Sequence, residues 1–221
     1  RVSLGPGNIQ ALGAGGTASS FPTVSNDGNL IAYASSFTNL VIDDTNVSRD
    51  IFVRDRSGVS TTRVSVDSVG TQSNGSSEFP VISADGRYVV FTTLATNLVA
   101  SDTSAVQKII RHDRQSGTTE LVSVGLGASL ANGNSYVAAI SADGSLIAFS
   151  SSANNLVNGD SNGCDDIFVR DMQSGTTSRV SVDSQGVQSS GSSAGPSISA
   201  DGRYVSFFSN GPNLVLGDTN N

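Results

Sequence analysis

A single unit repeats along the chain, and this repeat limits the fold more than any other feature. Each copy carries the tetrapeptide Ser-x-Asp-Gly, whose aspartate recurs every 58 residues. The four aspartates are Asp27, Asp85, Asp143 and Asp201. Self-similarity at a fixed period of this length is typical of solenoids, propellers and other repeat architectures.

Three further motifs keep the same register, which makes chance agreement negligible. Asn-Leu-Val begins at residues 39, 97, 155 and 213, Asp-Ile-Phe-Val-Arg-Asp at 50 and 166, and Arg-Val-Ser-Val at 63 and 179, with Leu-Val-Ser-Val at 121. The chain therefore divides into repeats at about 1–62, 63–120, 121–178 and 179–221, the last of them truncated.

Each repeat predicts four short strands. In the second repeat, a strand over 80–83 precedes the turn Ala-Asp-Gly, and a second strand covers 88–91. Asp and Gly tolerate positive φ, so this turn is a hairpin. The third strand corresponds to 51–54 of the first repeat, and the fourth to 64–66.

The second strand of each repeat has the period of two that a strand requires, with a bulky face turned to one side. We expect that face to be buried between neighbouring sheets. Its members are Val89, Phe91, Ile147, Phe149, Val205 and Phe207.

Four short antiparallel strands in a unit of this length are typical of a β-propeller blade. A β-solenoid has much shorter coils, and a β-sandwich domain needs about 90–100 residues. The sequence therefore predicts an all-β chain, a single β-propeller over 1–221 with about four blades. The last repeat stops at Asn221, before a third strand. We therefore expect the chain to be a piece of a larger propeller, or to form a propeller that a second copy completes by pairing with an open blade edge.

The segment Ile82–Phe91 resembles the TolB-type, WD40-like propeller repeat of bacterial envelope and secreted proteins. The longer pattern of Asn-Leu-Val, Asp-Ile-Phe-Val-Arg-Asp and Arg-Val-Ser-Val resembles a secreted bacterial subgroup. The resemblance covers essentially the whole chain. It implies an exported protein, periplasmic or extracellular, that acts through its loops or faces. It says little about function, because such propellers include scaffolds, surface proteins and domains attached to peptidases.

The composition limits the classes of partner that the chain is expected to bind. The formal net charge of −7 disfavours nucleic acids and anionic membranes, which require basic patches. No apolar run approaches the roughly 18–20 residues that span a bilayer. Cys164 is the only cysteine, so the chain has no internal disulfide framework.

Candidate catalytic groups are few, and the sequence predicts that the chain is not an enzyme. The repeated aspartates fit the hairpin turn, since a catalytic group is needed once and not in every repeat. His112, the only histidine, replaces the arginine of the other repeats on a polar strand position, and no Gly-x-Ser-x-Gly motif accompanies it. Cys164 is predicted to be a loop thiol of no special role, because the negative charge of the neighbouring Asp165 disfavours the thiolate.

The loop between the second and third strands is a candidate calcium site. Its oxygen-bearing side chains at positions 1, 3 and 7 resemble the ligand spacing of calcium loops. They are Asp44, Asn46 and Asp50 in the first repeat, and Asp160, Asn162 and Asp166 in the third. The other acids of such loops are missing, so the alternative is that these residues stabilise a turn. The second repeat keeps Asp102 but has Ser104 at position 3 and Lys108 at position 7. A lysine repels a divalent cation and offers no lone pair, so we expect no calcium in that repeat.

The leading functional hypothesis is a non-catalytic exported module that binds or scaffolds a protein or a glycan through its loops or faces. The alternative is a gate or regulatory propeller of a larger hydrolase. A longer gene with a hydrolase region would favour the alternative, and a gene made only of repeats would favour the first.

Overall fold

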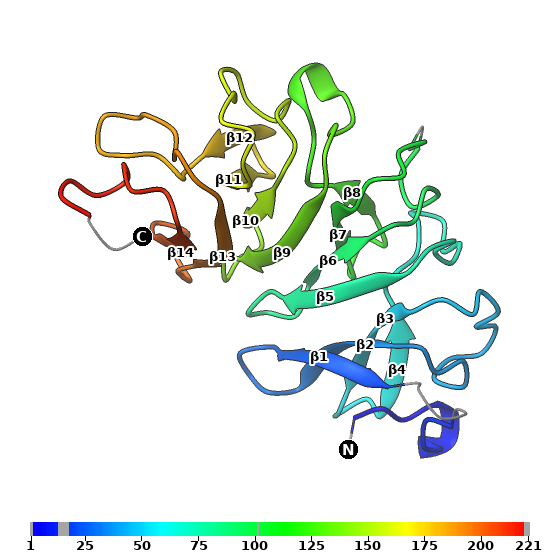
Figure 1. Cartoon of the computed structure of the whole chain (residues 1–221). Coiled ribbons are helices and arrows are strands. Elements are labelled where there is room, and N and C mark those ends of the chain that lie inside the picture. The colour runs from blue at the N-terminus through cyan, green and yellow to red at the C-terminus, as the bar shows by residue number, and fades with distance from the viewer. Residues whose placement is uncertain (1, 13–17, 101, 219–221) are drawn as a thin grey trace. The chain divides into compact units, whose positions relative to one another are not determined.

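The structure is a computed structural model that describes residues 2–12, 18–100 and 102–218. It contains two compact units, residues 1–105 with 110–121 and residues 106–109 with 122–221. Both units are built from antiparallel β-sheets (Figure 1). In the described residues the only helices are two short 3-10 turns, η1 (Pro6–Asn8) and η2 (Leu126–Ala128). The predicted all-β fold is confirmed.

The first unit contains two four-stranded sheets, in which neighbouring strands are consecutive in the chain. One sheet consists of β1 (Ser19–Val24), β2 (Leu30–Ser35), β3 (Asp50–Asp55) and β4 (Ser60–Arg63). The other consists of β5 (Ser77–Ile82), β6 (Tyr88–Thr93), β7 (Lys108–Asp113) and β8 (Thr119–Leu121), although residues 108 and 109 group with the second unit.

The second unit repeats this pattern. Its four-stranded sheet contains β9 (Ser135–Ile140), β10 (Leu146–Ser151), β11 (Asp166–Asp171) and β12 (Thr176–Arg179). The fourth repeat contributes a two-stranded sheet, β13 (Ser193–Ile198) and β14 (Val205–Ser209). Strand β13 packs against β9, β10 and β11, so successive sheets stack face to face within this unit.

The predicted buried face is confirmed in the four-stranded sheets. Val89 and Phe91 join a cluster with residues of β2 and β3, and Ile147 and Phe149 are fully buried in the second unit. The prediction was too strong for the fourth repeat, where Val205 and Phe207 lie in a sheet of only two strands and are half-buried.

The Ser-x-Asp-Gly segments form the predicted hairpin turns. In the first turn, the Asp27 carboxylate accepts hydrogen bonds from the Ser25 hydroxyl (2.5 Å) and the Asn29 amide (3.0 Å), and Gly28 has a φ of 72°. The other three turns repeat these contacts. Adjacent turns also bond to each other: Asn26 N donates to Ala84 O at 2.8 Å. The repeated aspartates therefore hold the turns.

The glycines of these turns differ in what surrounds them, and this gives a first prediction. At both Gly28 and Gly86 an alanine would adopt an unfavourable left-handed backbone. A Cβ at Gly28 would meet nothing, whereas a Cβ at Gly86 would lie 2.2 Å from the Leu30 side chain. We expect Gly86→Ala to destabilise the protein by about 1 kcal/mol more than Gly28→Ala, because Leu30 must shift. Urea denaturation measures this difference, and equal losses would contradict the packing.

The fourth strand of the four-stranded sheets differs from the prediction. In the first sheet it is β4, which pairs with β3 over Ser60–Arg63, and not the segment 64–66. The ladder ends because the Ser65 hydroxyl, in place of a backbone carbonyl, accepts the Ile51 amide at 3.1 Å. Strand β4 alternates exposed and half-buried polar residues, so it lacks the apolar signal on which the prediction relied.

The asparagine of the Asn-Leu-Val motif ties two loops together in every repeat. The Asn97 side chain accepts the Asn74 amide (2.9 Å) and donates to the Gln72 carbonyl (2.9 Å), and Leu98 beside it is buried. The other repeats have equivalent pairs of bonds. This clamp fixes the loop before the first strand against the loop after the second.

Candidate functional site

The residues predicted to bind calcium meet in both repeats, but an arginine lies among them. In the first repeat, Arg63 Nη1 is 3.1 Å from Asp44 Oδ1 and 3.7 Å from Asp50 Oδ2. The Asn46 amide donates to Asp50 Oδ2 at 2.9 Å, and the Ser65 hydroxyl donates to Asp50 Oδ1 at 2.5 Å. The two carboxylates therefore already have a cation between them.

The third repeat has the same arrangement, with Arg179 Nη1 at 3.2 Å from Asp160 and 3.5 Å from Asp166. Asn162 donates to Asp166 at 2.9 Å, as Asn46 does to Asp50. In the part of the chain that the structure describes, no three His, Cys, Asp or Glu side chains gather as a metal-binding group. The geometry favours the turn-stabilising alternative, with the arginine as partner of the acids.

Burial dominates the electrostatics of this cluster. It raises the pKa of Asp50 to about 6, even though Ser65, Asn46 and Arg63 all favour the carboxylate. It also raises the pKa of Asp44 and of Asp160. An acid with a raised pKa in the folded state loses stabilisation as the pH rises through that pKa. The cluster is therefore a buried charged network whose stability depends on its arginine.

Calcium binding in these loops stays a prediction, and melting curves test it. A ligand that binds only the folded state at a hundredfold excess over its Kd adds about 2.7 kcal/mol. The arginine ion pairs lead us to expect the same melting temperature in 5 mM calcium and in chelator. A rise with calcium that Asp44→Ala combined with Asp160→Ala removes would show instead that the metal displaces the arginine.

The structure places His112 on β7 and Cys164 in the loop before β11. His112 was predicted on a polar strand position, but it is buried, with Nδ1 at 2.9 Å from the Thr119 hydroxyl. Burial lowers its pKa. Cys164 lies half-buried in its loop, and its backbone amide donates to the Asn162 side chain at 3.0 Å.

No model of a known protein family matches the sequence, and no curated protein matches it either. Solved structures do match. A putative TolB from Agrobacterium tumefaciens aligns with 88% of this chain and 60% of its own, at 17% identity and a TM-score of 0.51. The fold is that of a TolB-like β-propeller. This agrees with the resemblance read from the repeat motif.

Other propeller-containing structures match equally well. An oligogalacturonate lyase from Vibrio parahaemolyticus aligns with 87% of this chain and 46% of its own (12% identity, TM-score 0.53). A prolyl endopeptidase structure aligns with 87% of this chain and 26% of its own (14% identity, TM-score 0.53). The chain thus spans less than two thirds of each of these proteins. At such identities the similarity establishes the fold alone, and function has to be argued from the propeller's own residues.

One feature that the sequence did not predict is a bulge in the first strand of each blade. The register shifts between Ser20 and Thr23 in β1 and between Glu78 and Val81 in β5. Phe21 and Phe79 occupy these bulges with φ of 53° and 52°. Their rings contact each other in a tilted arrangement, with centroids 4.3 Å apart and an interplanar angle of 47°. Proline follows the bulged residue in three of the four repeats, and this was the available signal.

The backbone of the Phe21–Phe79 pair is strained, and the Phe21 ring is partly exposed. A positive φ is unfavourable for a bulky side chain and costs about 1–3 kcal/mol at each position. Phe21 is 43% exposed, with the Arg49 guanidinium 5.7 Å from its ring centroid. At the matching bulge of β13 the residue is Gly195, which adopts this backbone without strain. The first two blades thus hold aromatic rings where glycine would be more stable.

Proposed function

We propose that the chain is a non-catalytic, exported binding module that contacts a protein or a glycan through the loops and faces of its blades. The observation that carries this proposal is the strained, partly exposed pair of Phe21 and Phe79. Strain of this kind persists where the side chain serves a function, and β-bulges re-aim side chains next to binding sites. Aromatic faces beside an arginine are the groups most enriched at recognition surfaces.

The propeller type supports a proposal for the location of the protein. We propose the periplasm or the outside of a bacterial cell, on the resemblance to envelope propellers. None of the helices in the described part of the chain has the length and apolar character needed to cross a bilayer. The net charge of −7 supports partners other than nucleic acid.

The test uses variants that relieve strain while removing the rings. Phe21→Gly with Phe79→Gly should leave the melting temperature unchanged or higher, because glycine accepts positive φ. Binding in glycan-array and peptide-array screens should fall at least about tenfold, as expected for the loss of aromatic anchors. Val59→Gly is the matched control, since Val59 is also exposed with a φ of 50°. Equal binding by the wild-type and the double variant would refute the proposal.

The alternative, a gate or regulatory propeller of a larger hydrolase, has one supporting observation. The match to the prolyl endopeptidase covers only 26% of that enzyme, so the fold occurs there as a part of a larger chain. A full-length gene that encodes a hydrolase region beside these repeats would favour it over the free-standing binding module.

We further propose self-association through β14, whose single partner strand among the described residues is β13. Phe208 on this strand is 69% exposed, whereas Ala34, at the same position of the first blade, is fully buried. Exposed sheet edges recruit further strands, and charges discourage this pairing. Light scattering should therefore give a dimer for the wild type and a monomer for Phe208→Glu. A wild type that stays monomeric at millimolar concentration would contradict it.

A further inference from the structure

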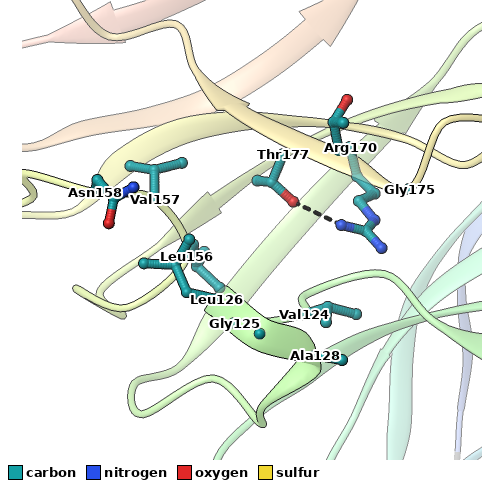
Figure 2. A pocket seen from close by; sticks show the side chains of 12 residues that line it. Val124, Gly125, Leu126, Ala128, Leu156, Val157, Asn158, Arg170, Gly175 and Thr177 are labelled. Carbon is teal, nitrogen blue, oxygen red and sulfur yellow. Dashed lines mark hydrogen bonds between the residues drawn. The ribbon is translucent and has the colours of Figure 1, made fainter.

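A pocket of about 370 Å³ lies in the third blade. One wall is the segment Val124–Ala128, which includes η2, and the opposite side consists of Leu156–Asn158 and parts of β11 and β12. Figure 2 shows Arg170 reaching toward the Val124–Ala128 segment, with a dashed bond to Thr177. None of the twelve lining residues, all of which the structure describes, is acidic.

Arg170 supplies the positive charge of this pocket. Its Nη1 donates to the Thr177 hydroxyl at 3.1 Å. Its Nε is buried and has no hydrogen-bond partner among the described residues. A buried donor without an acceptor costs about 1–3 kcal/mol, and more in a charged group. The guanidinium therefore keeps one donor unused, on a residue that lines the cavity.

In the first blade the equivalent arginine, Arg54, has one more hydrogen-bond acceptor. Arg54 Nη1 donates to the Thr61 hydroxyl at 3.1 Å, as Arg170 does to Thr177. Its Nη2 also donates to Asn8 Oδ1 at 2.6 Å. Asn8 is the last residue of η1, and the residue at the end of η2 is Ala128. The third blade thus lacks the amide oxygen that completes the arginine's bonding in the first.

Ala128 occupies that position at a conformational cost. Its φ is 61°, close to the 59° of Asn8. Asparagine tolerates the left-handed region well, whereas alanine does not. What alanine provides here is space in front of the guanidinium, since its side chain ends at Cβ.

The second blade has a matching pocket of about 420 Å³, but its chemistry differs. The acidic residue Asp67 is one of its lining residues, and His112 takes the position of Arg170. Thr119 donates to the Val66 carbonyl at 2.6 Å. A negative residue disfavours anions, so of these two pockets the third-blade one is suited to an anion, with an arginine donor that has no partner among the described residues.

We propose that the pocket between Val124–Ala128 and Arg170 binds the carboxylate of a small organic acid or of a peptide chain end, with the carboxylate on the guanidinium and an aliphatic portion against Leu126, Leu156 and Val157. Arginine and carboxylate match in geometry and can form two parallel hydrogen bonds. The pocket size suits a group of a few carbon atoms. This site is independent of the Phe21–Phe79 pair.

Titration calorimetry and NMR shifts with 4-methylpentanoate test the site, with 4-methylpentanamide as the uncharged control. The acid should bind about 10- to 100-fold more tightly than the amide, as expected for bonds to a charged group. A second comparison separates peptide chain ends from free organic acids. It uses N-acetyl-Ala-Leu with a free C-terminal carboxylate, and the same peptide with an amidated C-terminus as its uncharged control. If the free-carboxylate peptide binds more tightly than 4-methylpentanoate, the pocket is assigned to chain ends, and if 4-methylpentanoate binds more tightly, the pocket is assigned to free organic acids.

Two substitutions at one position separate binding from folding. Ala128→Asn should place an amide oxygen on Arg170 as Asn8 does on Arg54, keep or raise the melting temperature, and abolish binding. Ala128→Gly accepts the positive φ without filling the space, so its affinity should stay within about threefold of the wild type. The proposal is overturned if acid and amide bind equally, if Ala128→Asn binds as the wild type does, or if the acid fails to saturate the wild type below about 50 mM.

Discussion

Replacing Phe149 by alanine is expected to lower the free energy of unfolding by about 3–5 kcal/mol. Phe149 is fully buried in the central strand β10 and pairs in register with Phe168 on β11, with ring centroids 5.9 Å apart. The cost combines the lost burial of the ring and the cavity left among close-packed neighbours. Urea denaturation followed by far-UV circular dichroism gives the value.

Phe208→Ala, measured at a protein concentration at which light scattering shows the wild type as a monomer, is the matched control, because Phe208 is the same residue type on β14 but is 69% exposed. It should change stability by less than about 0.5 kcal/mol. A loss below about 1 kcal/mol for Phe149→Ala would mean that the second strand of the blade has been assigned to the wrong face.

Removing the arginine of the buried charged cluster should have a comparable effect. Arg63→Leu leaves Asp44 and Asp50, 3% and 0% exposed as side chains, without their cation. Breaking a buried ion pair in this way costs about 3–5 kcal/mol. The loss should grow with pH, because the folded-state pKa of Asp50, about 6 with the arginine present, lies above its unfolded value and rises further without it.

At about pH 4.5 the acids of the variant can take up protons, so the difference from the wild type should shrink there and reach its full size near pH 8. Adding Asp44→Asn and Asp50→Asn to Arg63→Leu removes the unpaired charges and should recover much of the stability. A destabilisation that is the same at both pH values would indicate a packing role for Arg63 rather than a charge role.

The sequence predicted the parts of the blade that depend on local chemistry. The hairpin at Asp85-Gly86 requires residues that accept a left-handed turn, and the alternation of Val89 and Phe91 sets the buried face. Strand β4 was missed because its residues are polar and partly exposed. The pairing of Asp50 with Arg63 had a signal in the sequence, since both are replaced in the second repeat, by Lys108 and Leu121.

The pocket of the third blade could not be found from the repeat. Between Leu4 and the first aspartate, Asp27, the chain is four residues longer than between Val66 and Asp85, so the register breaks where Asn8 lies. The equivalence of Asn8 and Ala128 is visible when the Val-Ser motifs at 2–3 and 122–123 are aligned, and η1 and η2 agree with it. Whether Arg170 lines a cavity depends on how the surrounding segments pack. The presence of an arginine at one position of a repeated strand does not reveal this.

The central claim is that this propeller binds its partner without transforming it. The most direct measurement incubates the purified chain with the glycans and peptides retained in the array screens, then elutes each ligand and determines its mass. We predict saturable retention and an unchanged ligand mass. A ligand recovered as a cleaved or modified product, in amounts that grow with time and vanish in His112→Ala, would contradict the claim and identify an enzyme.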